Sequence, residues 1–209
     1  FGLVDRLTID ADCVIRAHLC QHANPEYTVG PVWRGRGNAG TMYGFNAAVY
    51  EYALIDGVYY ECDYGVSRSV SPASGDAVIE WRMDVLEAGY GDQFWQGRLV
   101  DGGHMIFKDV RLVGHRKVGK LWNDYGLRAS GNWKTVTVDG CTVINRGHPL
   151  AFHRGEYIEQ VTIRDTTLAP GKGGRTGLLI HNYQRIDGLH IDGLNIIADP
   201  GDPASYYTD

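Results

Sequence analysis

The stretch that decides the fold is Phe107-Lys108-Asp109-Val110-Arg111-Leu112-Val113, two short β-type segments joined through one aspartate. The same pattern returns three times, always with Gly or Asp at its third position. The copies begin at residues 107, 138, 163 and 191, so the steps between them are 31, 25 and 28 residues. Recurrence at this period predicts an array of stacked supersecondary units. The later copies are Val138–Ile144, Ile163–Ala169 and Ile191–Ile197.

The repeating unit has the composition of β-strands. Val, Ile, Thr and Tyr dominate it, in short runs broken by Gly or Asp. Leucine-rich and helical repeats fit poorly, because there is no L-x-x-L-x-L consensus and no apolar stripe of period 3.6 between the copies. Each copy is therefore expected to form one rung of a parallel β-solenoid.

A third strand precedes each of the later copies, at Gly126–Ser130, Pro149–Arg154 and Gly177–Asn182. A rung of three such strands resembles the right-handed parallel β-helix of the pectate-lyase-like superfamily, over most of the chain from about residue 50. The resemblance implies a single all-β domain over residues 1–209, whole or a fragment of a longer chain, with an irregular tail at 198–209. Counted along the whole sequence, the repeated pattern predicts about seven or eight rungs.

The pattern continues upstream with less regularity. Ile9–Ile15 and Ile55–Glu61 match it, and the 46 residues between their first positions leave room for two short rungs or for one rung with an inserted loop. Val78–Gly89 is expected to hold another rung, in a register that the sequence leaves open.

Stacking in register turns equivalent residues of successive rungs into ladders about 4.8 Å apart per step. Two of the ladders are apolar, and their side chains are expected to face inward. A third ladder, of Asp and Gly, is expected at the bend between them, because the backbone there needs a left-handed conformation that Gly and Asp tolerate. A fourth ladder alternates in charge, which favours pairing between neighbouring strands and indicates a structural role and not a catalytic pair. The four ladders are Phe107, Val138, Ile163 and Ile191; Leu112, Val143, Leu168 and Ile196; Asp109, Gly140, Asp165 and Gly193; and Lys108, Asp139, Arg164 and Asp192.

Composition narrows the classes of function. The 209 residues are 44% hydrophobic, enough for one sizeable core. A net charge of −5 argues against attraction of the whole molecule to nucleic acid or to anionic membranes, and no apolar run is long enough to span a membrane. The four cysteines form no C-x-x-C pair; Cys141 is expected to be a small buried hydrophobe, and the disulfide states of Cys13, Cys20 and Cys62 are left open.

Basic and aromatic residues collect in the loops and third strands on one flank. In a solenoid these segments emerge on the same side, so a continuous strip is expected there. Three interpretations compete: a groove for an acidic polysaccharide, a nucleic-acid surface, which is less favoured, and solvated loops or an interface with an acidic subunit. The predicted ligand-binding residues are Arg116, Lys117, Lys120, Trp122, Tyr125, Arg128, Arg146, His148, Lys172 and Arg175.

The predicted catalytic residues are His153, His181 and Arg154, which fall at matching places on neighbouring third strands. Cleavage of a polyuronate by β-elimination needs a base and a stabilising cation, and a histidine pair with an arginine could supply both. Hydrolysis would instead need two carboxylates. The strip itself offers Asp124, with Glu156 at its edge, and an acidic cluster of Glu80, Asp84 and Glu87 lies one or two rungs earlier.

The sequence leaves enzymatic activity open between a polysaccharide lyase, a glycoside hydrolase and no enzyme. The Asp-Asp and Arg-x-Pro-x-x-Arg signatures of β-helical polygalacturonases and pectate lyases are absent, and Gly147-His148-Pro149 only partly matches Gly-His-Gly. No cofactor is expected, since Asp10 with Asp12, and Asp199 with Asp202, lack the density of oxygens that calcium requires.

We therefore expect an extracellular, cell-surface or virion-associated β-helix that binds an acidic polysaccharide, with cleavage left open. In this it resembles polysaccharide lyases and phage tailspikes. The alternative is a non-catalytic structural module, such as a spike shaft, an adhesin or a surface-filament subunit. Open solenoid ends need a cover. We therefore expect either that the chain is part of a longer protein, or that it forms a homo-oligomer, as a trimer or an end-to-end stack.

Overall fold

The computed structural model describes residues 6–14, 32–38, 46–49, 52–60, 69–72, 74–88, 101–114, 125–171 and 176–198. Every regular element in these ranges is a β-strand, as the Val-, Ile- and Thr-rich runs predict. The strands are β1 (Arg6–Val14), β2 (Val32–Asn38), β3 (Asn46–Val49), β4 (Tyr52–Tyr60), β5 (Ser69–Pro72), β6 (Val78–Ala88), β7 (His104–Lys108), β8 (Arg111–Gly114), β9 (Tyr125–Ala129), β10 (Trp133–Asp139), β11 (Thr142–Arg146), β12 (His148–Arg164), β13 (Thr167–Pro170), β14 (Leu178–Asp192) and β15 (Asn195–Ile196).

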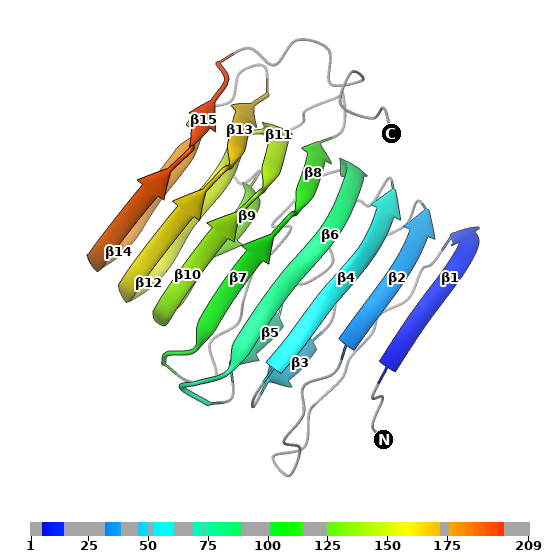
Figure 1. Cartoon of the computed structure of the whole chain (residues 1–209), viewed down its shortest axis with the longest axis horizontal. Coiled ribbons are helices and arrows are strands. Elements are labelled where there is room, and N and C mark those ends of the chain that lie inside the picture. Colours follow the sequence, from blue (N-terminus) through cyan, green and yellow to red (C-terminus); the bar gives the residue numbers. More distant parts are fainter. Residues whose placement is uncertain are drawn as a thin grey trace.

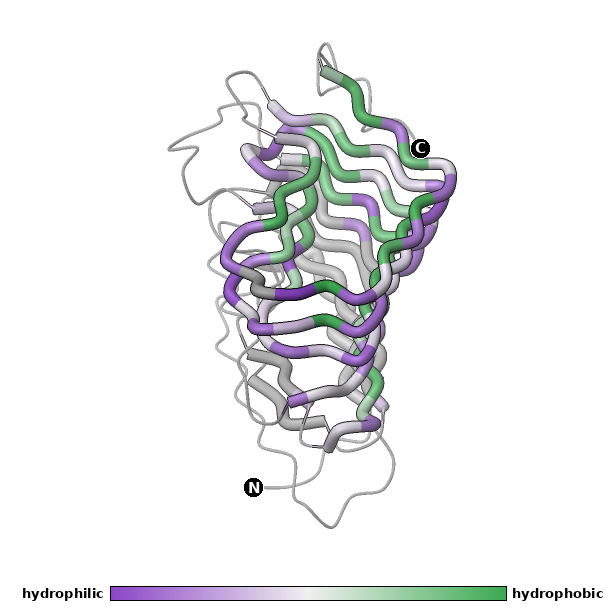
Figure 2. The backbone as a smooth tube through the Cα atoms, turned by 90° about the vertical axis from the view of Figure 1, so that its left-hand side faces the viewer, coloured by the Kyte–Doolittle hydropathy of each residue, from purple (hydrophilic) through white to green (hydrophobic). Residues whose placement is uncertain are grey.

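The strands stack in parallel, each beside its counterpart in the next rung (Figure 1). β1, β2, β4 and β6 follow one another, and β6 then pairs with β7 along its first half and with β8 along its second. From there two parallel ladders run on, β7–β10–β12–β14 and β8–β11–β13–β15. Figure 2 follows the backbone as it winds from one coil to the next. The predicted parallel β-solenoid is thus confirmed, while the total of seven or eight rungs stays a prediction and residues 199–209 lie outside the described part.

The predicted bend divides the two ladders. Asp109, Gly140, Asp165 and Gly193 have φ angles of 51°, 64°, 44° and 70°, all in the left-handed region. Asp and Gly alternate here for a steric reason, because a Cβ on Gly140 would lie 2.5 Å from Asp109 Oδ1. The aspartate of one rung therefore occupies the space that a side chain of the next rung would need.

Both apolar ladders are confirmed by the pairing of neighbouring strands. Up to residue 168 their members are fully buried, and burial of each such side chain stabilises the fold by about 1.5–3 kcal/mol. Cys141 lies beside them as a free, buried thiol, as expected. Its Sγ is 3.4 Å from the carbonyl oxygen of Phe107, and burial raises the pKa of the thiol to about 12.

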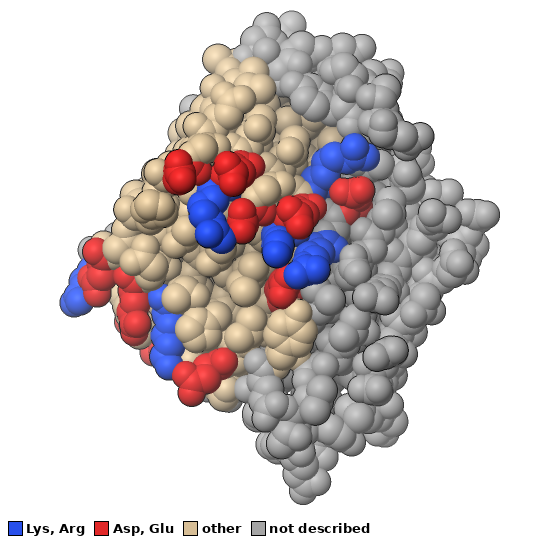
Figure 3. Space-filling model, viewed as in Figure 1, with Lys and Arg blue, Asp and Glu red and all other residues tan. Residues whose placement is uncertain are grey.

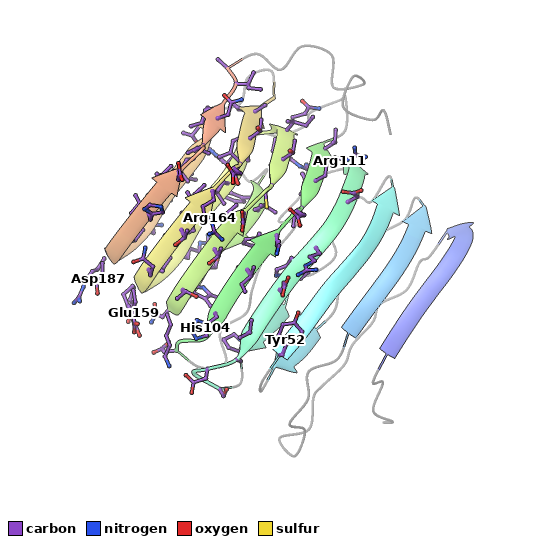
Figure 4. The ribbon with its side chains drawn as sticks, in the orientation of Figure 1. Tyr52, His104, Arg111, Glu159, Arg164 and Asp187 are labelled. Atoms are coloured by element: carbon purple, nitrogen blue, oxygen red, sulfur yellow. The ribbon has the colours of Figure 1, made fainter. Side chains whose placement is uncertain are left out.

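The charged ladder is also confirmed, on the solvent-facing side of the same strands. The Nη2 atom of Arg164 donates to Asp139 Oδ2 at 2.7 Å, one rung back. Figure 3 shows basic and acidic side chains next to one another on this face, and Figure 4 shows Arg164 in their midst. The Arg164–Asp139 contact joins two neighbouring rungs, which supports the structural interpretation of the ladder.

The upstream register differs from the expectation in one place. Ile55 pairs with Trp81 and with Trp33, and Trp33 pairs with Leu7, so Leu7 continues the apolar ladder. The sequence pattern instead aligns Ile9 with Ile55. When the pairing of two strands shifts by two residues, every side chain stays on the same face of its strand. The alternating sequence pattern alone therefore cannot distinguish the two registers.

Candidate functional site

The predicted third strands lie side by side. β9 pairs with the beginning of β12, which in turn pairs with the beginning of β14. Phe152 is the Cα partner of both Ala129 and Ile180, and His153 is the Cα partner of His181. The predicted match in position between the two histidines is therefore confirmed.

Steric constraints separate the two faces of these strands. Phe152 belongs to the core. Leu127 and Ala129 of β9 belong to the core as well. Successive side chains of a strand point to opposite faces, so His153, which follows Phe152, and Arg128, which lies between Leu127 and Ala129, are on the outer face.

Four aromatic rings meet on this outer face. The Tyr125 ring stacks on His148 and on His153, with centroids 5.3 and 5.4 Å away and interplanar angles of 28°. His153 stacks in turn on His181, at 5.1 Å and 17°. The ring stack therefore spans all three third strands and joins two of the three predicted catalytic residues.

A guanidinium group lies over the stack. The Cζ atom of Arg128 is 4.7 Å from the centroid of the Tyr125 ring, within the range of a cation–π interaction. Its Nε donates a hydrogen bond to Ser130 Oγ at 3.0 Å, and the Ser130 carbonyl accepts one from Trp133 Nε1 at 3.0 Å. These contacts tie the position of the cation to a tryptophan of the core.

Two residues of this cluster do not figure among the predicted site residues. Ser130 orients Arg128, and Thr176 Oγ1 lies 2.9 Å from His148 Nδ1, within hydrogen-bonding distance. Ser130 could have been found from the ladder, since it follows Ala129 as His153 follows Phe152. Thr176 carries no comparable signal in the sequence.

The rungs turn a second corner directly after the ring stack. Gly131, Arg154 and Asn182 have φ angles of 94°, 66° and 58°, and the Gly131 amide donates to the Arg154 carbonyl at 3.1 Å. An arginine in the left-handed region is uncommon, and such strained positions cluster at functional sites. Arg154 and His181 are both exposed, so this corner carries the accessible part of the cluster.

The remaining predicted residues divide into two groups. Tyr125, Arg128, Arg146 and His148 are buried, and so is the predicted catalytic residue His153. The sequence suggests an open basic strip, but the part of it that is described is a covered cluster with an exposed corner. Whether any of these residues binds a ligand stays a prediction. Arg116, Lys117, Lys120, Trp122, Lys172 and Arg175 lie outside the described residues.

The arrangement suits an anionic ligand. Arg128 lies over the Tyr125 ring, Arg154 directly follows His153 along β12, and Arg146 precedes His148 by two residues. Guanidinium groups form strong charge-assisted hydrogen bonds with carboxylates and sulfates. Imidazoles can in addition accept or donate a proton near neutral pH.

The acidic cluster proposed for hydrolysis is engaged in contacts within the sheet. Glu80 accepts hydrogen bonds from the Tyr52 hydroxyl at 2.8 Å and from Arg82 Nε at 2.6 Å. Burial and the Glu80 carboxylate together raise the pKa of Tyr52 to about 12. Asp84 lies 3.8 Å from Arg111 Nε, and burial raises the pKa of its carboxyl group. Glu87, the third acid, lies outside the described side chains.

No family model, no curated protein and no solved structure gives a significant match to this chain. Within the described residues, no group of three or more His, Cys, Asp or Glu side chains is placed to hold a metal ion. The same part of the chain contains no helix with the length and apolar character needed to cross a membrane.

Proposed function

We propose that this chain is a β-helix that binds an acidic polysaccharide at the corner formed by Arg154 and His181. One observation carries the proposal: the stack of Tyr125, His148, His153 and His181, with Arg128 over it, ends at this exposed corner. Arg154 and His181 would contact the carboxylates or sulfates of the glycan. The buried cations behind them would add to the attraction, since charges act more strongly where water is excluded.

The fold is the basis for placing the chain near the pectate-lyase-like β-helices and the tailspikes, and this relationship is part of the proposal. With it comes an extracellular, cell-surface or virion setting. The reaction that fits the corner is β-elimination. An imidazole takes the C5 proton beside the carboxylate and Arg154 stabilises the resulting anion; the C4–C5 double bond then forms as the C4–O bond breaks, and the leaving oxygen takes a proton from water. Binding does not depend on this step, so the two are tested separately.

Binding is tested with polygalacturonate and with a sulfated glycan, using neutral dextran as the reference. We expect Arg154→Ala to weaken binding of the acidic glycans about 10- to 150-fold, because a charge-assisted hydrogen bond contributes about 1.5–3 kcal/mol. Arg185→Ala is the matched control: Arg185 is an exposed arginine of β14 that pairs with Asp187, away from the corner. Equal loss in both variants, or equal binding of dextran, would contradict the proposal.

Cleavage is tested by following the ultraviolet absorbance of the unsaturated product. A signal that is lost in His181→Ala but retained in Arg185→Ala would assign elimination to the corner. Binding without any signal would leave a glycan-binding module that is not an enzyme.

One observation favours the second candidate, a structural module. The last described rung exposes Ile180, Leu189, Ile191 and Ile196, each between 43% and 51% accessible. An apolar end surface of this kind is typical of a segment that continues into another packed layer.

A further inference from the structure

The apolar residues of the last rung occupy positions that every neighbouring rung buries. Ile191 is 43% exposed, whereas its partner Ile163 and the next ladder member, Val138, are both 0% exposed. The same contrast separates Leu189 from Val161. In every earlier rung, the equivalent surface is covered by the rung that follows. The last described rung exposes this surface.

The last described rung also has strand edges without a further partner in the described part of the chain. Among the described strands, β14 pairs only with β12, and β15 only with β13. The first strand of the sheet, β1, likewise pairs only with β2 in the described part. Figure 1 shows β14 and β1 at opposite edges of one parallel sheet. A strand added beside β14 would thus have the orientation that β1 presents.

The register supplies a match between these two edges. Leu7 belongs to the ladder that ends at Ile191, through Trp33, Ile55 and Trp81. Continuing the ladder would bring Leu7 opposite Ile191.

Charges along the two strands are compatible in this register. Thr8 would lie opposite Asp192 and Arg6 opposite His190, so no acid faces an acid and no lysine or arginine faces another. The register therefore brings no two like charges of Asp, Glu, Lys or Arg together at the junction.

We propose that the β14–β15 end of this chain is an interaction surface for a second copy of the same chain, which docks through its β1 edge. The contact is head to tail, and each copy keeps one free end, so association does not close at a dimer and produces linear assemblies. This surface is separate from the Arg154–His181 corner, and loss of glycan binding would leave the assembly intact.

The test measures the mass of the chain by sedimentation velocity over a series of concentrations. The unmodified chain should show a weight-average mass that rises with concentration beyond that of a dimer. Leu189→Lys with Ile191→Lys places two charges on the docking surface and should hold the chain as a monomer. Thr162→Lys adds a charge to β12, one rung inside, and should leave the assembly unchanged.

A mixing experiment establishes the polarity of the contact. Leu7→Lys changes only the β1 edge and should also give monomers, with circular dichroism confirming that the strands remain folded. Thr8→Glu, which would face Asp192, is a second β1-edge variant that avoids the apolar ladder. An equimolar mixture of a β1-edge variant and the Leu189→Lys/Ile191→Lys variant retains one intact pair of edges, so it should form a discrete dimer.

Two results would overturn the proposal. A monomer at every concentration of the unmodified chain would show that a second copy does not cover this surface. Dimerisation of both β1-edge variants alone would instead indicate that two β14 edges meet symmetrically.

Discussion

At the scale of single residues, the alternation of Asp and Gly at the first bend is a steric requirement as well as a conformational one. Gly140 and Gly131 both have positive φ angles, but only Gly140 faces a neighbouring atom, Asp109 Oδ1, at 2.5 Å from its ideal Cβ. Gly131 has nothing within 4 Å of its ideal Cβ. A side chain at position 131 would therefore meet backbone strain alone, whereas one at position 140 would meet backbone strain and crowding.

We expect Gly140→Ala to lower the free energy of unfolding by about 1–3 kcal/mol more than Gly131→Ala, because it adds overpacking to the same backbone strain. Denaturation in urea measures both variants. Adding Asp109→Gly to Gly140→Ala should recover most of the difference, and equal losses in the two single variants would rule out crowding as the cause.

Cys141 gives a second prediction at this scale. Burial raises the pKa of its thiol to about 12, so almost no thiolate forms at mildly alkaline pH. Iodoacetamide should leave Cys141 unmodified in the native protein and modify it fully in urea, as measured by peptide mass spectrometry. The effect has a defined sign: reactivity rises only as the pH approaches the raised pKa or as the chain unfolds. Rapid native labelling of Cys141 would contradict the packing described for it.

At the scale of elements, the charged ladder makes the register of the solenoid testable. Arg164 lies between Asp139 and Asp192 on adjacent strands. Arg164→Glu would place three acids in a row and should destabilise the fold by about 0.5–2 kcal/mol, since each directly opposed pair contributes about 0.2–1 kcal/mol. Urea denaturation at low and high salt measures the change, which should shrink as salt screens the charges.

A double-mutant cycle tests whether the contact is the cause. Asp139→Lys together with Arg164→Glu restores opposite charges on these two strands but sets a lysine opposite Lys108. The double variant should therefore lose less stability than the sum of the losses in the two single variants. Additive losses in the double variant would mean that the two side chains do not interact.

The periodic part of the sequence predicts these elements well, for a physical reason. A parallel solenoid places the same position of each rung in the same environment, so Phe107, Val138 and Ile163 share a chemical type as well as a burial. The pattern does not determine the register where two registers bury the same face of a strand. This happens at the first strand, where the sequence favours Ile9 and the structure places Leu7 in the ladder. Alternation specifies a face, and only pairing with a neighbour specifies the position along it.

The candidate site is less predictable than the fold, because its contacts join residues that no repeat relates. The sequence matches His153 to His181 by counting along the strands. It does not show that the Tyr125 ring stacks on His153, or that Arg128 is buried over that ring. Those features depend on the outer packing of three strands, where side chains of different rungs differ in size and do not form a ladder.

At the scale of the whole molecule, a solenoid is held together by contacts between neighbouring rungs, so its stability varies along its length. An end rung has a neighbour on one side only and should open at a lower free energy than the rungs inside it. Among the described strands, β14 is such an edge, and its apolar residues Leu189 and Ile191 are exposed.

Hydrogen exchange measures this gradient directly. In dilute solution, where association is suppressed, amides of the second half of β14 should exchange faster than those of their partners in β12, around Val161 and Ile163, which have neighbours on both sides. Raising the protein concentration should slow exchange in β14 and leave β12 unchanged, if a second copy covers the edge. Exchange in β14 as slow as in β12 at every concentration would show that the last rung is stable without a neighbour, and that the exposed ladder does not weaken this end of the molecule.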